Sequence, residues 1–574
     1  MDRNDSSNST DFFNAMNSET NKLVEMLGGK VGEEYLNNLN SAWSQLLSKP
    51  TDPQGWMDAI SEYQTSSLQF WSTLITGGSD LSGTPATGDR RFKSDEWSSS
   101  PVFNYIKESY LIASQLLNKA ASNANLDEKG QKKLEFYTQQ YIDAMSPSNF
   151  AATNPEVIQQ AIETKGQSLI DGLQNLMGDL DKGRISMTDE SAFVLGENIA
   201  TTPGEVVFQN EIFQLIHYKP TCDKVAERPV LIIPPCINKF YIMDLQPGNS
   251  FVKYSVEQGQ NTFLISWVNA GKEHGHLGWD DYVESGVLQA IEALKEISGS
   301  SKVNAVAWCI GGTILSASLA VMAARKDNSV ASATFLTALT DFSEPGDIGV
   351  FVDEEQISKI TKKVDEEGFQ SGKNLSNAFN MLRSNDLIWS YVVNNYLKGQ
   401  SPVPFDLLYW NSDPTNMPAK FYSYYMTNMY LENNLAKPGK LNICGVPIDL
   451  TKIKVPCYFL SCVDDHIAPW KTTFKGTELL KQCEFVLGAS GHIAGVINPV
   501  SKDRRHYWID GELGDTAEKW QETAQRQEGS WWKHWSVWLK KRGGKQVAAP
   551  ESLGSDTYKP IEAAPGSYVA KRAD

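Results

Sequence analysis

The sequence predicts an α/β fold, a largely parallel sheet covered by helices, that follows a helical N-terminal region. Two observations predict it: the hydrophobic period changes near residue 191, and short apolar runs then alternate with helical segments. The 574 residues suffice for more than one domain, since a domain averages about 150 residues. Hydrophobic residues make up 41% and charged residues 21%, which is typical of a globular chain and excludes whole-chain disorder.

Charge and cysteine content narrow the function classes. The formal net charge of -17 argues against general nucleic-acid binding, because that function needs a basic face. No apolar run reaches the about 18 residues that a membrane helix needs, and the polar first residues lack a secretory signal. All seven cysteines follow residue 221, which is not the pattern of a disulfide scaffold. We therefore expect a reduced, cytoplasmic setting and no transmembrane segment.

Residues 1–190 are predicted to form a helical domain. Apolar residues recur at helical spacing between Phe103 and Leu117, and the segment 155–179 begins with Pro155, a favourable first-turn residue. This part contains neither cysteine nor histidine, so it offers no obvious nucleophile or proton shuttle. We interpret it as a domain for packing, docking or dimerisation.

Residues 191–574 are predicted to form the catalytic α/β domain. Strand-like segments lie at 206–217, 230–233, 262–267, 303–308, 333–339, 455–460 and 484–487. Helical patterns separate several of them, for example 283–297 and 313–324, which implies parallel pairing. The stretch between 339 and 455 lacks this rhythm and is too long for a loop. We expect it to insert a cap, at about 342–452, over the active edge of the sheet.

The segment 307–312, Ala-Trp-Cys-Ile-Gly-Gly, is the sharpest local signal. It follows an apolar strand and precedes a helix, the setting of a nucleophile elbow, in which small residues flank the nucleophile at two positions' distance. Cys309 takes the nucleophile's place, and the helix N-terminus behind it favours a thiolate. A buried structural cysteine before a Gly-Gly turn is the alternative for this motif in isolation.

Two downstream residues favour the catalytic interpretation. Asp465 follows one predicted strand, and His492 lies on a small-residue loop after the next, so the order nucleophile, acid, histidine is that of α/β hydrolases. We expect His492 to take the thiol proton and Asp465 to orient the imidazole. Asp464 is an equal alternative to Asp465 on the sequence alone, and His466 is a less favoured alternative base.

The strand at 230–233 is followed by Cys236, where this fold builds the oxyanion hole. Cys236 is a rival nucleophile, but we interpret the backbone N–H groups of Ile237 and Ile310 as candidate oxyanion donors. Neither a metal-ligand motif nor a phosphate-binding glycine loop is present in the sequence. We expect no metal and no bound cofactor.

Two further features carry weaker information. Trp531, Trp535 and Trp538 share one face of a C-terminal helical segment. Core packing is the favoured interpretation, and an apolar surface for a hydrophobic product is the alternative.

Arg505, in the basic segment 502–506, is a candidate contact for the phosphates of an acyl carrier. A solvated basic loop is an equal alternative.

Together these motifs resemble the polyhydroxyalkanoate synthases, most of all the single-component class I enzymes. The resemblance runs from about residue 89 to the end of the sequence. The matching segments are 89–92 with Trp97, 147–156, 234–241, 244–247, 309–313, 408–413, 430–433, 465–470 and 488–499. The family's elbow begins with Gly where this chain has Ala307, which is still small enough for the turn.

The resemblance implies a substrate and a mechanism. The substrate would be an (R)-3-hydroxyacyl-coenzyme A (CoA), with class I favouring short monomers such as 3-hydroxybutyryl-CoA. Cys309 would attack the thioester, release CoA and hold the acyl chain, and the 3-hydroxyl of another unit would then extend the polyester. Asp465 would orient His492 or activate that hydroxyl; the sequence leaves both open. CoA is then a leaving group and not a cofactor.

The resemblance also implies partners and leaves alternatives. Family members work as homodimers on growing cytoplasmic granules, with granule-coat proteins as partners, which adds granule association to the expected roles of residues 1–190. A cysteine-dependent thioesterase or polyester depolymerase would use the same triad. A non-catalytic granule scaffold is a third class, which would not need a reactive cysteine.

Overall fold

The computed structural model describes residues 61, 64–66, 68, 88–124 and 126–573. The chain divides into two compact units. We call Met1–Asp189 with Asn377–Val403 the helical unit, and Glu190–Ser376 with Pro404–Asp574 the sheet unit. The segment 377–403 lies inside the range expected for the cap but clusters with the helical unit. The predicted helical domain, residues 1–190, includes residues 1–60 and 69–87, which lie outside the described residues.

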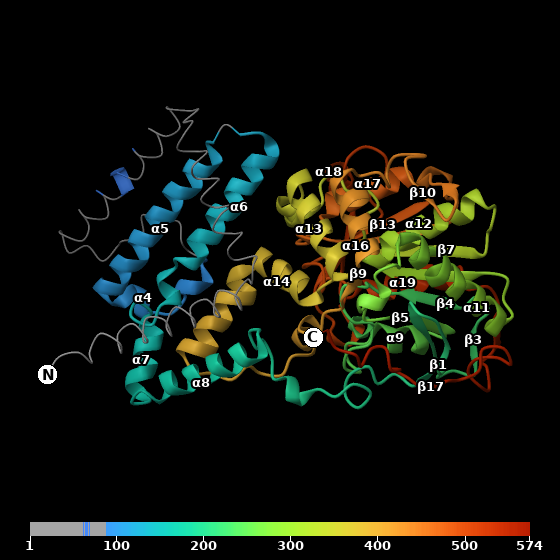
Figure 1. Cartoon of the computed structure of the whole chain (residues 1–574), viewed down its shortest axis with the longest axis horizontal. Coiled ribbons are helices and arrows are strands. Elements are labelled where there is room, and N and C mark those ends of the chain that lie inside the picture. Colours follow the sequence, from blue (N-terminus) through green and yellow to red (C-terminus); the bar gives the residue numbers. More distant parts are fainter. Residues whose placement is uncertain (1–60, 62–63, 67, 69–87, 125, 574) are drawn as a thin grey trace. The chain divides into compact units, whose positions relative to one another are not determined.

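The helical unit is built from amphipathic helices, as its apolar spacing predicts (Figure 1). They are α4 (Glu96–Ser99), α5 (Pro101–Ser122), α6 (Glu128–Ala144), α7 (Pro155–Glu163) and α8 (Gln167–Lys182). Asp127 caps α6 by accepting a hydrogen bond from the Gly130 N–H at 2.7 Å. Two π-helical turns, Asn385–Trp389 and Val392–Leu397, complete the unit.

The segment 155–179 is two helices and not one. Lys165 and Gly166 adopt positive φ angles of 53° and 86°, which end α7 and start α8 in a new direction. Several apolar side chains of the segment remain exposed, among them Ile162 and Leu173 at 72% and 57%. The sequence pattern therefore predicts the helical state correctly. It does not predict the break, or that part of the apolar face is exposed.

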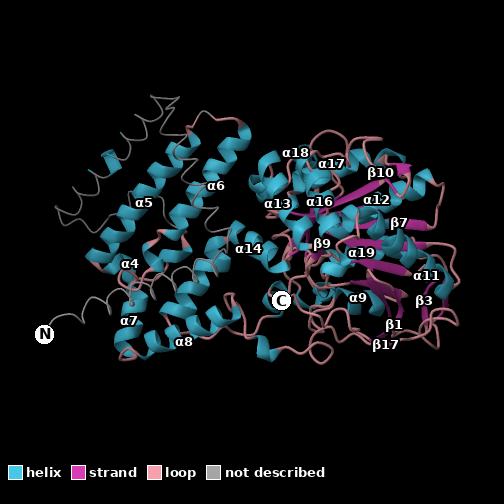
Figure 2. Ribbon diagram, in the orientation of Figure 1, coloured by secondary structure: helices cyan, strands magenta, loops and turns pink. Residues whose placement is uncertain are grey.

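One large sheet organises the sheet unit and confirms the predicted α/β class (Figure 2). Its strand order in the described residues is β15-β14-β13-β12-β7-β6-β4-β5-β2-β1-β17. The bounds are β1 Gly204–Gln209, β2 Phe213–Tyr218, β4 Val230–Ile233, β5 Thr262–Trp267, β6 Val303–Trp308, β7 Val330–Leu336, β12 Cys457–Cys462, β13 Cys483–Gly488, β14 His506–Ile509, β15 Gln525–Glu528 and β17 Glu562–Ala563. The six strands from β13 to β5 pair in parallel, so their carboxyl ends meet at one edge.

Helices cover the parallel strands and bury their apolar residues. They include α9 (Phe251–Glu257), α11 (Gln289–Ser298), α12 (Ile310–Ala324), α17 (Trp470–Leu479) and α19 (Trp531–Lys540). Trp531, Trp535 and Trp538 of α19 are buried in the core cluster around the sheet. The Trp535 Nε1–H also donates to Thr334 Oγ1 at 3.1 Å. The tryptophan face is therefore core packing, the favoured interpretation of its sequence pattern.

The insertion between β7 and β12 packs on the loop that follows β5. Within the sheet unit it includes α13 (Glu354–Glu367), α15 (Asp406–Asn411), α16 (Ala419–Tyr425) and the π-helical turn η10 (Met426–Leu431). Trp279 stacks on Phe421 and Tyr425, with ring centroids 4.9 and 5.6 Å apart. These aromatic contacts fix α16 above the carboxyl edge of the sheet.

The described residues lack two further kinds of feature. No described helix combines the length and the hydropathy that a membrane span requires. No group of three His, Cys, Asp or Glu side chains among the described residues could hold a metal ion.

The buried tryptophan of α19 gives a stability prediction. Replacing Trp535 by Ala removes a fully buried ring and its hydrogen bond, so we expect the free energy of unfolding to fall by about 3–5 kcal/mol. Val537, on the same helix, is 56% exposed, and Val537→Ala should change that free energy by less than about 0.5 kcal/mol. Urea unfolding followed by tryptophan fluorescence measures both, and equal losses would contradict the packing described.

Candidate active site

Cys309 lies on a strained turn between β6 and α12. Its backbone has φ 53° and ψ -128°, a conformation that side-chain-bearing residues rarely adopt. The Cys309 N–H donates to the Leu336 carbonyl at 2.9 Å, and its own carbonyl accepts from the Gly312 N–H at 2.8 Å. The turn thus holds the half-buried thiol at the carboxyl edge of the sheet, as an elbow requires.

The two glycines after Cys309 are needed for close approach. A Cβ on Gly311 would lie 2.5 Å from the Ile233 carbonyl oxygen, and one on Gly312 would lie 2.4 Å from the Ala338 Cβ. Real Cβ atoms do not approach so closely. Ala307, where the elbow pattern has glycine, is fully buried within β6.

Asp465 and His492 are brought together at the same edge of the sheet. Asp465 follows β12, His492 follows β13, and the Nδ1–H of the imidazole is 2.7 Å from Asp465 Oδ2. The other carboxylate oxygen accepts from the N–H groups of Ile467 and Ala468, each at 2.9 Å. Asp464 is exposed, whereas Asp465 is buried. The geometry therefore distinguishes two acids that the sequence cannot.

His492 connects this carboxylate to Cys309. Burial lowers the pKa of His492, but the charge of Asp465, the proximity of the Cys309 sulfur and hydrogen bonds to both groups raise it to about 10. The imidazolium form is thus stabilised between an acid and a thiol. Such a site can take the thiol proton and hold the resulting thiolate as part of an ion pair. The carbonyl of His466, the alternative base, accepts from the Asp347 N–H at 2.9 Å.

Cys236 lies behind Cys309 and is fully buried. Burial raises the pKa of its thiol, and the nearby Cys309 raises it further. A thiol that resists ionisation is a poor nucleophile, so this environment favours Cys309 over Cys236. The Ile237 carbonyl accepts from the Thr415 N–H at 2.8 Å. Ile310 opens α12, and first-turn N–H groups have no partner within their own helix.

Comparison with known proteins places this chain in a family. Residues 88–255 match the model of the poly-beta-hydroxybutyrate polymerase (PhaC) N-terminus, and residues 229–499 match that of the alpha/beta hydrolase fold. A poly(3-hydroxyalkanoate) polymerase subunit PhaC of Cupriavidus necator is 45% identical over 90% of this chain and 88% of its own. The chain belongs to the poly(3-hydroxyalkanoate) polymerase family.

Other members of this polymerase family are similar over comparable lengths. The subunit PhaC of Rhizobium meliloti is 41% identical over 91% of this chain and 87% of its own. Poly(3-hydroxyalkanoate) polymerase 1 of Ectopseudomonas oleovorans is 36% identical over 87% and 89%. These matches confirm the family resemblance that the sequence motifs predict.

Two tyrosines of the insertion lie near Cys309 in this polymerase. Tyr425 ends α16 and Tyr430 lies in η10; both are buried, and both interact electrostatically with the Cys309 sulfur. Burial raises the pKa of each, and their ring centroids lie 5.2 Å apart. The sequence analysis did not assign either a role at the site; the aromatic density of 421–430 was the available signal.

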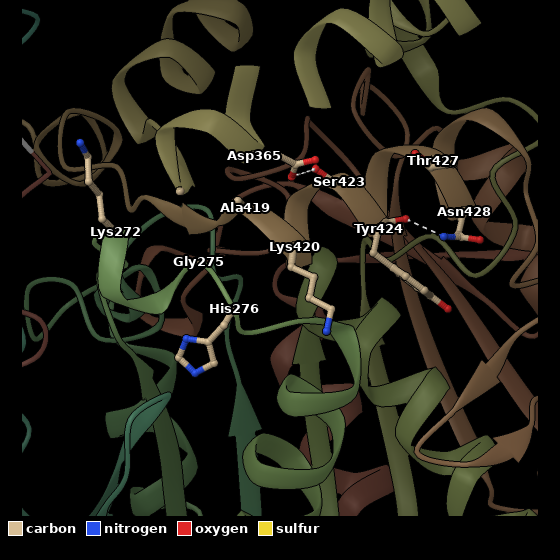
Figure 3. A pocket seen from close by; sticks show the side chains of 11 residues that line it. Lys272, Gly275, His276, Asp365, Ala419, Lys420, Ser423, Tyr424, Thr427 and Asn428 are labelled. Carbon is tan, nitrogen blue, oxygen red and sulfur yellow. Dashed lines mark hydrogen bonds between the residues drawn. The ribbon is translucent and has the colours of Figure 1, made fainter. Parts of the chain in front are cut away.

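Arg505 is the sequence-predicted candidate contact for the CoA phosphates. Arg505 is exposed just before β14, with a φ of 72°. A separate pocket of about 550 Å³ is lined by residues that include Lys272, His276 and Lys420 (Figure 3). Its lining does not include Cys309 or His492.

The raised pKa of His492 predicts a pH-dependent stability. Its folded value of about 10 exceeds the ordinary 6.5, so its contribution is complete at low pH and is lost as pH rises through this window. We expect the stability advantage of the wild type over His492→Gln to shrink between about pH 6 and about pH 10.

Urea unfolding of both proteins across this range provides the measurement. His276→Gln is the matched control, because the His276 side chain is 61% exposed. An advantage over His492→Gln that does not change with pH would contradict the description of His492.

Proposed function

We propose that this polymerase makes polyhydroxyalkanoate from (R)-3-hydroxyacyl-CoA through a thioester on Cys309. The observation that carries the proposal is that His492 interacts with Cys309 and hydrogen bonds to Asp465 at one sheet edge, in a chain of the polymerase family. A short monomer such as 3-hydroxybutyryl-CoA is the substrate we propose to test first. CoA leaves as product, so no cofactor is consumed.

In the first step, Cys309 becomes acylated. His492 takes the proton from the thiol, and the thiolate attacks the thioester carbonyl of the substrate. The carbon–sulfur bond to CoA then breaks, and His492 returns its proton to the departing CoA sulfur. One thioester replaces another, so the step needs no further energy source. The N–H groups of Ile237 and Ile310 would stabilise the negative oxygen of the intermediate.

In the second step, the chain grows. The 3-hydroxyl of the next unit gives its proton to His492 while its oxygen attacks the Cys309 thioester. An ester bond forms, the carbon–sulfur bond breaks, and the thiol is regenerated. Asp465 orients His492 in both steps. The two N–H groups that hold its other oxygen support this role over direct activation of the hydroxyl.

The burial of the groups around Cys309 supports transfer to an alcohol over transfer to water. His492 is 6% exposed, and Tyr425 and Tyr430, which interact electrostatically with the Cys309 sulfur, are also buried. Water that reached the thioester would hydrolyse it, so its exclusion favours chain growth. The same triad in an open site would suit a thioesterase or a depolymerase, and free hydroxyacid would then be the product.

We propose supporting roles for the remaining parts. Residues 1–190 serve dimerisation, docking or granule association, and the sheet unit with its insertion carries the chemistry. Arg505 is a candidate contact for the CoA phosphates. The working form would be a homodimer on cytoplasmic polyester granules, with granule-coat proteins as partners.

The Cys309→Ala variant tests the covalent step. Removing the sulfur removes the acyl acceptor, so we expect CoA release from 3-hydroxybutyryl-CoA to fall by about 10⁴-fold or more. Circular dichroism should show an unchanged fold. Cys222→Ala is the matched control, because Cys222 is exposed and should keep full activity. Substantial CoA release by Cys309→Ala would discard the mechanism.

The His492→Gln variant tests proton transfer to the imidazole. Glutamine keeps a polar side chain but cannot act as a base, so acylation of Cys309 should slow by about 10²-fold or more. Rapid quenching followed by mass spectrometry of the peptide containing Cys309 measures this rate. Acylation at the wild-type rate would remove the assigned role of His492.

A further inference from the structure

The segment 568–572 packs against the loop that carries Ile237. Val569 is 1% exposed within the core, which anchors the segment to the sheet unit. The Lys571 carbonyl accepts from two side chains: the Lys239 ammonium and the Asn269 amide, the latter at 3.1 Å. Lys239 is only two residues from Ile237, so this carbonyl holds the oxyanion-side loop directly.

Arg572 extends the contact to the insertion. Its guanidinium lies 3.9 Å from Asp413 Oδ1 and 3.5 Å from the Ser412 carbonyl. It also lies 6.0 Å from the centre of the Tyr409 ring. Burial lowers the pKa of Arg572, but the charges of Asp413 and Glu190 outweigh burial and raise it. The guanidinium also lies 3.5 Å from Glu190 Oε2, so it pairs with two carboxylates.

Asp413 contacts the segment that follows Ile237 and Lys239. It is 2% exposed, and its Oδ2 accepts from the Tyr241 hydroxyl at 2.9 Å. Its charge also opposes the effect of burial, which lowers the pKa of Lys239 to about 8. A buried carboxylate of this kind needs its cations. Removing one cation leaves Asp413 undercompensated, so the groups around it must rearrange.

The insertion donates hydrogen bonds to two backbone carbonyls of the loop that carries Ile237. The Trp410 Nε1–H donates to the Lys239 carbonyl at 2.7 Å, and the Thr415 N–H donates to the Ile237 carbonyl at 2.8 Å. Residues 410–415 therefore contact both Ile237 and Lys239, and Arg572 contacts residues 412–413. A shift of Asp413 would be transmitted to the peptide groups beside Ile237.

We propose that Arg572 is a positioning residue that fixes the Ile237 N–H through Asp413 and the Lys239 loop. The inference rests on the proposed function, because it assumes that Ile237 donates to the oxyanion. Oxyanion donors act only when they are held in place before the reaction. A misplacement of about 1 Å can cost about 10²-fold in rate, while substrate binding elsewhere is unaffected.

The test compares Arg572→Ala with Arg572→Lys. We expect kcat for CoA release to fall by about 10- to 100-fold in Arg572→Ala, with KM close to that of the wild type. Arg572→Lys keeps a cation near Asp413 and should recover part of kcat. The rate of Cys309 alkylation by iodoacetamide should stay unchanged in both, because it reports the thiolate and not the oxyanion donors.

Controls separate this inference from general damage. Arg526→Ala removes an exposed arginine that pairs with Glu528 at 3.1 Å and should leave kcat unchanged. If Arg572→Ala does not fold, as judged by circular dichroism, Arg572→Gln and Arg572→Lys replace it in the comparison. Wild-type kcat in the folded variants would overturn the inference, and so would parallel losses of kcat and alkylation.

The same set of variants distinguishes the two proposals. If Cys309→Ala is inactive and Arg572→Ala has wild-type kcat, the positioning role fails and the proposed function stands. If Cys309→Ala still releases CoA, the proposed function fails, and with it the basis of the positioning role.

Discussion

The hydrogen bond between His492 and Asp465 is the interaction on which the site depends. Burial alone would favour a neutral imidazole, and a neutral imidazole would not stabilise a thiolate. The carboxylate reverses that preference, since the pKa of His492 rises to about 10 despite burial. Asp465 can do this because two backbone N–H groups hold its other oxygen. The loops after the neighbouring strands β12 and β13 thus supply the two groups that hold the imidazolium beside Cys309.

The parallel sheet makes this arrangement possible. β6, β12 and β13 end at one edge, so residues 309, 465 and 492 meet although they are far apart in the chain. The elbow adds a local constraint, because its positive φ and its two close-packed glycines aim the thiol outward. The insertion then supplies two buried tyrosines near the sulfur. The sheet brings the three side chains together, the strained elbow presents the thiol, and the buried insertion residues favour an alcohol over water as the acyl acceptor.

Sequence reasoning predicted the features that have short-range signals. The apolar runs predicted the central strands, and the small residues around Cys309 predicted the elbow. The choice of Asp465 over Asp464 needed the structure, because adjacent residues on a turn point in different directions. The break at Lys165 and Gly166 also escaped the periodicity, since the apolar spacing continues through it.

Long-range packing escaped the sequence altogether. Nothing in the sequence indicates that residues 377–403 cluster with the helical unit, or that Arg572 meets Asp413. The sequence also does not indicate that Tyr425 lies near Cys309, because a run of aromatic residues does not show which ring approaches the sulfur. In each case the deciding contacts join segments that no local pattern connects.

Peptide mass spectrometry of the wild type, quenched during turnover of 3-hydroxybutyryl-CoA, tests the central claim most directly. We predict that the peptide containing Cys309 carries one or more 3-hydroxybutyryl units, which hydroxylamine removes as expected for a thioester. Sustained polymer formation with an unmodified Cys309, or with the acyl group on Cys236, would contradict it.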